Sequence, residues 1–329
     1  MKNADDGISR RRAIQLFAAS AALSGAPAAA ADAHLHRWSG VALGAGASLT
    51  LRHEDGREAG RLIALALKEI ERLENIFSLY RPESALSGLN KNARLAYPPA
   101  ELVELLSICA AVNRATGGAF DPAVQAVWAY HAETNSGAAE PDEARLRALV
   151  ANSGWRHVSV ASNEIRLSSP SAALTLNGVA QGYVTDRVTK LLRDNGLKDV
   201  LASVGEIAAF GTRGPYENWR VGLSGAGGES VAETIDLVDE AVATSAPLAT
   251  TFDQAGRRGH ILDPKTGRPA QSSWRQVSVV HRSAAIADGL STGLTLIDPA
   301  AVERTISVFA NTRVIAYDKA GRRRTFANR

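Results

Sequence analysis

The chain has 329 residues, of which 45% are hydrophobic and 22% are charged, and its formal net charge is +3. This composition is ordinary for a soluble globular protein, and the length allows one large domain or two modest ones. The basic residues are spread along the sequence, and we interpret the run at 322–324 as a solvated strand edge or tail, so no nucleic-acid partner is expected. No apolar stretch is long enough to span a bilayer.

The first 33 residues differ in kind from the rest of the chain. A basic start with the pair Arg10 and Arg11 is followed by a weakly apolar, alanine-rich run that ends in small residues. This order predicts a cleaved export signal over 1–33, and the paired arginines resemble the twin-arginine type, so we expect a periplasmic protein. The alternative, an ordinary amphipathic helix, is disfavoured because no polar face runs from Ala18 to Ala31.

Cys109 is the only cysteine, so the chain can form neither an intramolecular disulfide nor a cysteine-based metal site. It lies in an amphipathic helical pattern and is predicted to be a small core residue. Because no cysteine follows the apolar run of the signal, we expect no lipid anchor and no other membrane anchor.

Beyond the signal, the hydrophobic periodicity predicts helices and strands that mix without a strict βαβ repeat. The expected elements are a strand over 40–53, a helix over 57–77, a loop over 78–90, a helix over 99–115, a polar loop over 135–141, a helix over 142–152, strands over 157–161, 164–167 and 173–176, a helix over 182–195, strands over 200–204, 219–223, 233–238, 241–244 and 276–280, a helix over 285–296 and a final helix–strand pair. We therefore predict an α+β fold with mixed sheets and packed helices. No repeat or linker divides it, so 34–329 is expected to be one domain.

Two oxygen-bearing side chains indicate a candidate metal site. Asp288 and Thr292 are four residues apart in a predicted helix, so they share one helix face. A carboxylate and a hydroxyl are hard ligands suited to Mg²⁺, which usually keeps water and substrate phosphates as its other ligands. The alternative is that Asp288 stabilises the start of the helix with no metal present.

Two further segments are candidates for a phosphate site. Asn177-Gly178-Val179-Ala180 leads into a predicted helix, where backbone N–H groups can approach a phosphate, although such a turn is often only a turn. His260 precedes a proline- and glycine-containing turn at 263–267, and that turn alone does not explain the histidine. A structural role for His260 remains the alternative.

Seven segments in order resemble the FAD:protein FMN transferase family, formerly called thiamine-biosynthesis lipoproteins. They cover roughly residues 40–313 and read FSLYRPESALSGLN (77–90), ATGGAFDPAV (115–124), LNGVAQGYVTDRV (176–188), ASVGEIAAFG (202–211), AVATSA (241–246), HILDPKTGRPA (260–270) and ADGLSTGL (287–294). The resemblance implies a flavin-transferase, T-fold-like architecture. It also implies that FAD is the substrate and Mg²⁺ the cofactor.

The resemblance assigns roles to individual residues. Mg²⁺ would be held by Asp288, Thr292 and the backbone carbonyl of Gly178. Asp288 and His260 are the implied catalytic residues, with Asp288 as a candidate acceptor of the hydroxyl proton. The implied flavin-nucleotide contacts are Asn90, Gly118, Asp121, Asn177, Gly178, Val179, Gln181, Thr244, Ser245 and His260.

The implied reaction moves FMN from FAD to a Thr or Ser hydroxyl of a periplasmic or periplasm-facing flavoprotein, and AMP leaves. Twin-arginine export resembles the branch that serves a respiratory partner or nitrous oxide reductase maturation. Two alternatives stay open: a periplasmic FAD carrier without transferase activity, and a magnesium-dependent FAD pyrophosphatase that releases free FMN.

The chain departs from the family pattern at five positions near these motifs. The family usually has aspartate, glycine and lysine where this chain has Thr175, Asn177 and Gln181. It has glycine where this chain has Glu206 and Ala246. Losing the lysine removes a positive charge that would steady a phosphate, so the departures affect transfer efficiency more than flavin binding and favour a divergent branch.

Overall fold

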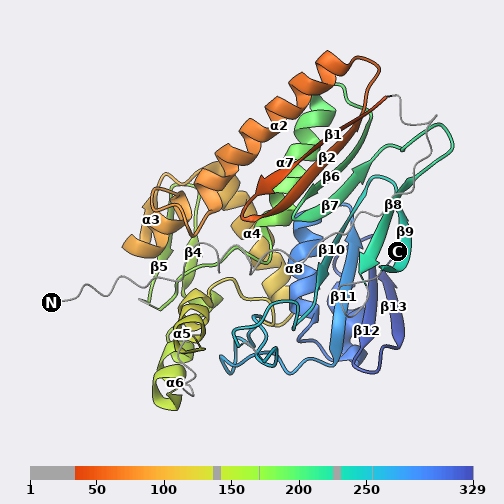
Figure 1. Cartoon of the computed structure of the whole chain (residues 1–329). Helices are drawn as coiled ribbons and strands as arrows, with labels where there is room; N and C mark the ends of the chain where they lie inside the picture. The colour runs from red at the N-terminus through yellow and green to blue at the C-terminus, as the bar shows by residue number, and fades with distance from the viewer. Residues whose placement is uncertain (1–33, 136–141, 170, 225–230, 254, 329) are drawn as a thin grey trace.

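The structure is a computed structural model that describes residues 34–135, 142–169, 171–224, 231–253 and 255–328. The predicted export signal at 1–33 and the polar loop after Asn135 lie outside these residues. Figure 1 shows one face of a long sheet covered by helices, with smaller helical and strand elements at the edges.

The central element is an eight-stranded sheet in which every neighbouring pair is antiparallel, in the order β1-β2-β6-β7-β10-β11-β12-β13. Its strands are β1 (Leu35–Ala42), β2 (Ala45–Arg52), β6 (Asp199–Val204), β7 (Glu206–Phe210), β10 (Glu240–Ser245), β11 (Trp274–His281), β12 (Thr312–Asp318) and β13 (Arg323–Asn328). Sequential strands and helices that lack a repeating parallel unit confirm the predicted α+β class.

The amino-terminal part of the sheet is a hairpin rather than the single strand predicted over 40–53. Strands β1 and β2 pair through Ala42 and Ala45, and the two residues between them, Leu43 and Gly44, have φ angles of 51° and 76°. Two successive positive φ angles make the tight turn that suits the twist of a two-residue hairpin. The prediction was wrong because the alternation of small and apolar residues continues through the turn.

Three long helices cover the sheet: α2 (Gly56–Phe77), α7 (Ala180–Asp194) and α8 (Ala284–Leu294). Helix α7 packs against α2, α8, β6 and β7, and α8 packs against β10 and β11. The helices α7 and α8 cross closely at Gly182, where an added Cβ would lie 2.3 Å from the carbonyl oxygen of Ala284. Only glycine allows this approach, which fixes the start of α7 against the start of α8.

A fourth helix, α4 (Ala100–Ala115), packs beside α8 and confirms the predicted helix. Cys109 is fully buried in it, as predicted for a core residue, and burial raises the pKa of its thiol. Among the described helices, none is both long and apolar enough to cross a membrane.

The remaining elements correct the sequence-based assignment in several places. They are α3 (Ala85–Asn92), α5 (Gln125–Asn135), α6 (Glu143–Ala151), α9 (Val302–Ile306), the small sheet β3-β5-β4 (Arg94–Ala96, Glu164–Leu167, Val158–Val160) and the hairpin β8-β9 (Trp219–Ser224, Val231–Leu237). Helix α3 occupies part of the predicted loop 78–90, because Ser84 caps it by accepting from the N–H of Ser87 at 3.0 Å. No strand forms at 173–176, and α5, β7 and β13 were not predicted.

Candidate active site

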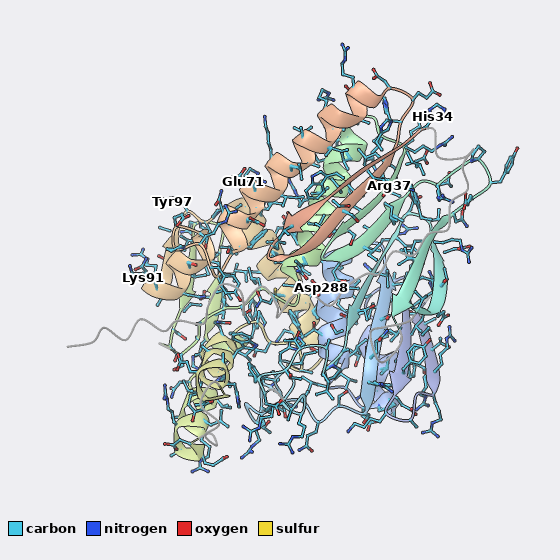
Figure 2. The ribbon with its side chains drawn as sticks, in the orientation of Figure 1. His34, Arg37, Glu71, Lys91, Tyr97 and Asp288 are labelled. Atoms are coloured by element: carbon cyan, nitrogen blue, oxygen red, sulfur yellow. The ribbon has the colours of Figure 1, made fainter. Side chains whose placement is uncertain are left out.

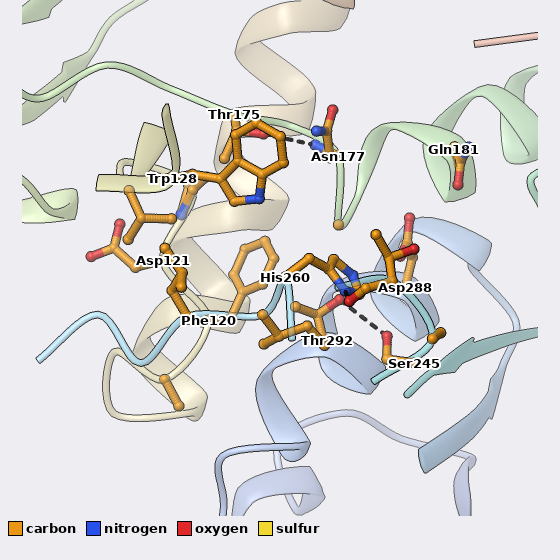
Figure 3. Close-up of a pocket in the computed structure, with 18 of the residues that line it drawn as sticks. Phe120, Asp121, Trp128, Thr175, Asn177, Gln181, Ser245, His260, Asp288 and Thr292 are labelled. Atoms are coloured by element: carbon orange, nitrogen blue, oxygen red, sulfur yellow. Dashed lines mark hydrogen bonds between the residues drawn. The ribbon is translucent and has the colours of Figure 1, made fainter. Parts of the chain in front are cut away.

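One pocket gathers most of the residues predicted from the sequence (Figure 3). It lies where the turn before α7, the end of β10, and α8 meet. Its walls come from segments 119–124, 175–181, 244–250 and 260–264, together with Trp128, Glu206, Asp288 and Thr292. Figure 2 places Asp288 inside the molecule, whereas Glu71 and Lys91 lie on the outer helices α2 and α3.

Asp288 lies in the second turn of α8 and is only 4% exposed. The start of α8 is capped by other groups: Ser283, and the carboxylate of Asp186 on α7, which accepts from the N–H groups of Ala284 at 2.7 Å and Ala285 at 3.1 Å. The helix-cap interpretation of Asp288 is therefore wrong. The buried position of Asp288 in α8 therefore needs an explanation other than helix capping.

Two helices share the Asp288 carboxylate. Its Oδ2 accepts a hydrogen bond from the backbone N–H of Gly182, in the first turn of α7, at 3.2 Å. Burial is the main reason that the pKa of Asp288 rises to about 7, and the nearby charge of Asp186 adds to the rise, although the Gly182 hydrogen bond opposes it. A carboxylate kept in such surroundings gains from any cation that enters the pocket.

Thr292 follows Asp288 by one turn and faces the turn before α7. An added Cβ at Gly178 would lie 3.0 Å from Oγ1 of Thr292, so these two residues are in close contact. From β10, Oγ of Ser245 lies 3.2 Å from Oγ1 of Thr292 and 2.7 Å from Oγ of Ser291. The hydroxyl groups of Ser245 and Thr292 therefore line the pocket together with the Asp288 carboxylate.

These donors suit a hard divalent cation. Asp288, Thr292 and a backbone carbonyl at Gly178 would supply a carboxylate, a hydroxyl and a carbonyl, all oxygen ligands of the kind that Mg²⁺ prefers. Among the residues that the structure describes, no group of three or more His, Cys, Asp or Glu side chains could hold a metal by itself. A cation here would therefore need water and substrate oxygens to complete its coordination, as Mg²⁺ usually does.

The glycine turn before α7 offers fewer phosphate-binding groups than the sequence predicts. The N–H groups of Val179 and Ala180 both bond to the carbonyl of Leu176, at 3.0 and 2.7 Å, and the N–H of Gly182 bonds to Asp288. These bonds hold the turn rigid against α8. They also occupy the N–H groups of Val179, Ala180 and Gly182, which are then not available to bind a phosphate.

His260 enters the pocket from the segment after the loop at 250–259. Its backbone N–H and its ring Nδ1 both lie 3.0 Å from the carbonyl oxygen of Thr250. Since a carbonyl only accepts, Nδ1 carries the proton and Nε2 presents a lone pair. Burial lowers the pKa of His260, which keeps the imidazole neutral near pH 7.

The charge lining the pocket is entirely acidic among the described residues. Asp121, Glu206 and Asp288 line it, and no lysine or arginine does. Burial raises the pKa of all three carboxyl groups, and the charge of Asp288 raises the pKa of Glu206 further. Asp121 is also held by the N–H groups of Ala123 and Trp155, at 2.8 and 2.9 Å, so it braces the wall of the pocket.

Three predicted flavin contacts do not line the pocket: Asn90, Gly118 and Val179. The Asn90 amide pairs with both backbone groups of Leu174, donating to the carbonyl at 2.8 Å and accepting from the N–H at 2.7 Å. The pocket geometry therefore gives no support to Asn90 as a flavin contact, and its observed role is to hold the segment before the glycine turn. Gly118 has a φ of +82°, which shapes the loop behind the pocket wall.

Sequence reasoning missed the aromatic wall of the pocket. Trp128 and Phe120 line it, and the Trp128 ring packs against Phe252 with centroids 5.4 Å apart. Trp128 lies on α5, which was not predicted as a helix. The apolar spacing Val124, Val127 and Trp128 was the available signal.

Comparison with known proteins identifies the family. Residues 43–316 match the model of the ApbE family. An FAD:protein FMN transferase of Vibrio cholerae is 31% identical over 235 residues, which are 68% of this chain and 70% of the relative. The FAD:protein FMN transferase of Escherichia coli K12 is 24% identical over 258 residues, 74% of this chain and 73% of the relative.

The fold also matches solved structures. The flavin transferase ApbE from Vibrio cholerae superposes with a TM-score of 0.77 at 24% identity, covering 89% of this chain and 97% of that one. The apo form of the Pseudomonas stutzeri flavinyl transferase ApbE gives a TM-score of 0.76 at 23% identity, covering 90% and 94%. The chain therefore belongs to the ApbE family, the family of the FAD:protein FMN transferases.

Proposed function

We propose that this chain is a magnesium-dependent enzyme that transfers FMN from FAD to a Thr or Ser hydroxyl of an acceptor protein and releases AMP. Membership of the family supports the coarser statement, that it moves FMN from FAD to a protein. The more specific proposal is magnesium-dependent transfer to a Thr or Ser hydroxyl. The observation that supports it is the buried carboxylate of Asp288 beside the Thr292 hydroxyl, in a pocket without a lysine or arginine among its described lining residues.

The charge of the pocket explains the need for a cation. The pyrophosphate of FAD is anionic, and it would enter a site already lined by Glu206 and Asp288. Like charges at short range in a partly dry site repel strongly. When bound to Asp288, Thr292 and the Gly178 carbonyl, Mg²⁺ would supply the positive charge that lets the pyrophosphate enter and that stabilises the charge on the leaving phosphate.

The protein groups position the reactants for an in-line displacement. The acceptor hydroxyl oxygen forms a bond to the FMN-side phosphorus, and the bond from that phosphorus to the bridging oxygen breaks, so AMP leaves with the electron pair. The proton of the hydroxyl goes to Nε2 of His260, which is unprotonated because Nδ1–H donates to Thr250. His260 is the better proton acceptor than Asp288, because Asp288 is committed to Gly182 and to the cation.

One experiment separates this proposal from its two alternatives. The purified protein is incubated with FAD and Mg²⁺, with and without a candidate acceptor, and both AMP and covalently bound flavin are measured. A transferase releases AMP only with an acceptor and leaves flavin on it. AMP without an acceptor would indicate a pyrophosphatase, and neither product would indicate an FAD carrier.

We also propose that the reaction takes place in the periplasm, after twin-arginine export. The support is the arginine pair followed by the alanine-rich run in the first 33 residues. The acceptor would then be a periplasmic or periplasm-facing flavoprotein of a respiratory or nitrous oxide reductase maturation system. Export of an already folded protein is compatible with a buried nucleotide site assembled from distant segments.

A further inference from the structure

Two carboxylates are exchanged where α7 and α8 cross. Asp186 on α7 accepts hydrogen bonds from the N–H groups of Ala284 at 2.7 Å and Ala285 at 3.1 Å, in the first turn of α8. In return, Asp288 on α8 accepts from the N–H of Gly182, in the first turn of α7, at 3.2 Å. Each helix therefore binds the start of the other, and the two contacts together fix how α7 and α8 lie.

The exchange is reciprocal in the sequence as well. Asp186 follows Gly182 by four residues and Asp288 follows Ala284 by four residues, so each carboxylate lies about one turn beyond the amide that the other helix binds. Between the two contacts, an added Cβ at Gly182 would be 2.3 Å from the carbonyl oxygen of Ala284. Because the helices meet backbone to backbone there, a shift of one helix along the other would change both carboxylate contacts.

The two carboxylates differ in what else they contact. Asp288 lines the pocket, whereas Asp186 is not among the described residues that line it. Besides the two amides of α8, Oδ2 of Asp186 accepts from Oγ of Ser283 at 2.7 Å. Hydrogen bonds to a charged acceptor are stronger than neutral ones, and a negative charge at a helix start is favourable. Asp186 therefore supplies the stronger of the two contacts, and it is directed at the start of α8 rather than at the pocket.

The crossing sets the spacing of the proposed cation ligands. Asp288 and Thr292 lie on α8, whereas the carbonyl of Gly178 belongs to the turn before α7. An added Cβ at Gly178 would be 3.0 Å from Oγ1 of Thr292, so the two elements also meet at the pocket. Mg²⁺ requires near-ideal octahedral geometry with ligands at about 2.0–2.1 Å, so even a small shift of α8 against this turn would disturb the site.

We propose that Asp186 is a positioning residue of the cation site, which holds α8 so that Asp288 and Thr292 face the Gly178 carbonyl. It acts through the first turn of α8 and not as a ligand of the cation. Groups that orient metal ligands contribute strongly to metal affinity, although they do not bind the metal themselves. This inference rests on the cation site of the proposed function.

The test measures the affinity for Mn²⁺, used as the probe without FAD, by calorimetry and by the electron paramagnetic resonance signal of free Mn²⁺. Two substitutions separate position from charge. Asp186→Asn places an amide N–H₂ group against the donors of α8, whereas Asp186→Glu keeps the charge but lengthens the side chain by one methylene. We expect both variants to bind Mn²⁺ about 10-fold more weakly than the wild-type protein, as is usual when a group that orients metal ligands is replaced.

Asp55→Asn is the matched control. Asp55 caps the start of α2 by accepting from the N–H groups of Arg57 at 2.7 Å and Glu58 at 3.3 Å, and it is not among the described residues of the pocket. Its substitution removes the same charge and the same kind of contact, so we expect a lower melting temperature and an unchanged Mn²⁺ affinity. Ser283→Ala is a milder variant, which keeps the Asp186 carboxylate but removes one of its donors, and we expect a smaller loss of Mn²⁺ affinity.

The outcomes separate this inference from the proposed function. No saturable Mn²⁺ binding to the wild-type protein, or unchanged binding in Asp288→Asn, would overturn both. If Asp288→Asn abolishes binding while the Asp186 variants bind as the wild-type protein does, the cation site stands and the positioning role is refuted. Wild-type affinity in Asp186→Glu alone would reduce the effect to charge and would refute that role, as would an equal loss in Asp55→Asn. Far-ultraviolet circular dichroism shows whether each variant is folded. If the Asp186 variants do not fold, wild-type affinity in Ser283→Ala refutes the positioning role and a loss supports it.

Discussion

Replacing Asp288 with asparagine should stabilise the metal-free protein while it removes the response to metal. Asparagine keeps the shape of the side chain and can still accept the N–H of Gly182, but it carries no charge. The wild-type carboxylate is 4% exposed and lies near the charge of Asp186, so its ionisation in the folded protein is unfavourable. The substitution removes that unfavourable charge.

The size of the expected change in the free energy of unfolding follows from the pKa of Asp288, which rises from its ordinary value of 3.8 to about 7. Below pH 3.8 the group is protonated in both states and has no effect. As the pH rises from 3.8 to about 7, the unfolded chain loses the proton first, so the free energy of unfolding falls. Above about pH 7 the loss is constant, at about 4 kcal/mol for a shift of this size.

The assay is thermal unfolding at pH 8, first in EDTA and then with Mg²⁺ and FAD. In EDTA, Asp288→Asn should melt higher than wild type, by about 2 °C for each kcal/mol gained. With Mg²⁺ and FAD, only the wild-type protein should gain stability, because binding to the folded state adds RT ln(1 + [L]/Kd). Asp194→Asn is the matched control, since Asp194 is exposed and forms an ion pair with Lys190, and exposed pairs of this kind contribute little.

Two results would refute this reasoning. If Asp288→Asn melts lower than wild type in EDTA at pH 8, the charge of Asp288 stabilises the metal-free fold. The argument that this charge is unfavourable until a cation binds would then be wrong. If Mg²⁺ and FAD raise the melting temperature of both proteins equally, the cation binds elsewhere. Repeating the EDTA measurement at pH 4 provides an internal check, because the difference between the two proteins should nearly vanish there.

Three further predictions concern the pocket and the predicted export signal. His260→Gln should lower the rate of FMN transfer at least about 100-fold with little change in FAD affinity, because it removes a proton acceptor rather than a phosphate contact; a normal rate would exclude His260 as the base. FAD should bind much more tightly than FMN in calorimetry with Mg²⁺, because both phosphates and the adenylate half contribute, and equal affinities would indicate a generic flavin site. Changing Arg10 and Arg11 together to lysine should block export, and an undiminished amount of protein in the periplasm would contradict the twin-arginine prediction.

Sequence reasoning predicted those parts of the site that depend on local periodicity. Asp288 and Thr292 share a face because four residues make about one helical turn, and the structure places both in the pocket. The sequence could not show that Asp186, from another helix, caps α8 and frees Asp288 from that role. That fact depends on the close crossing of α7 and α8 at Gly182, a contact between residues about 100 positions apart.

The same limit explains what was missed. The Leu43-Gly44 turn was hidden because apolar residues continue through it, so one strand was predicted where the structure has a hairpin. Glu206 was recognised as a departure, but its place in the same pocket as Asp288 depends on the pairing of β7 with β10. The tautomer of His260 depends on the Thr250 carbonyl, which only the folded loop brings to it. The composition and motifs predicted the class of fold, and most of the predicted site residues line the pocket, whereas tertiary contacts decide their chemical state.

The most direct test of the central claim is the appearance of covalent flavin on an acceptor. Candidate periplasm-facing flavoproteins are coexpressed with the wild-type chain or with Asp288→Asn, separated under denaturing conditions and examined for in-gel flavin fluorescence. We predict fluorescence on an acceptor with the wild-type chain, its loss when the acceptor Thr or Ser is replaced by alanine, and none with Asp288→Asn. Equal fluorescence with Asp288→Asn would contradict the cation-dependent transfer that we propose for this pocket.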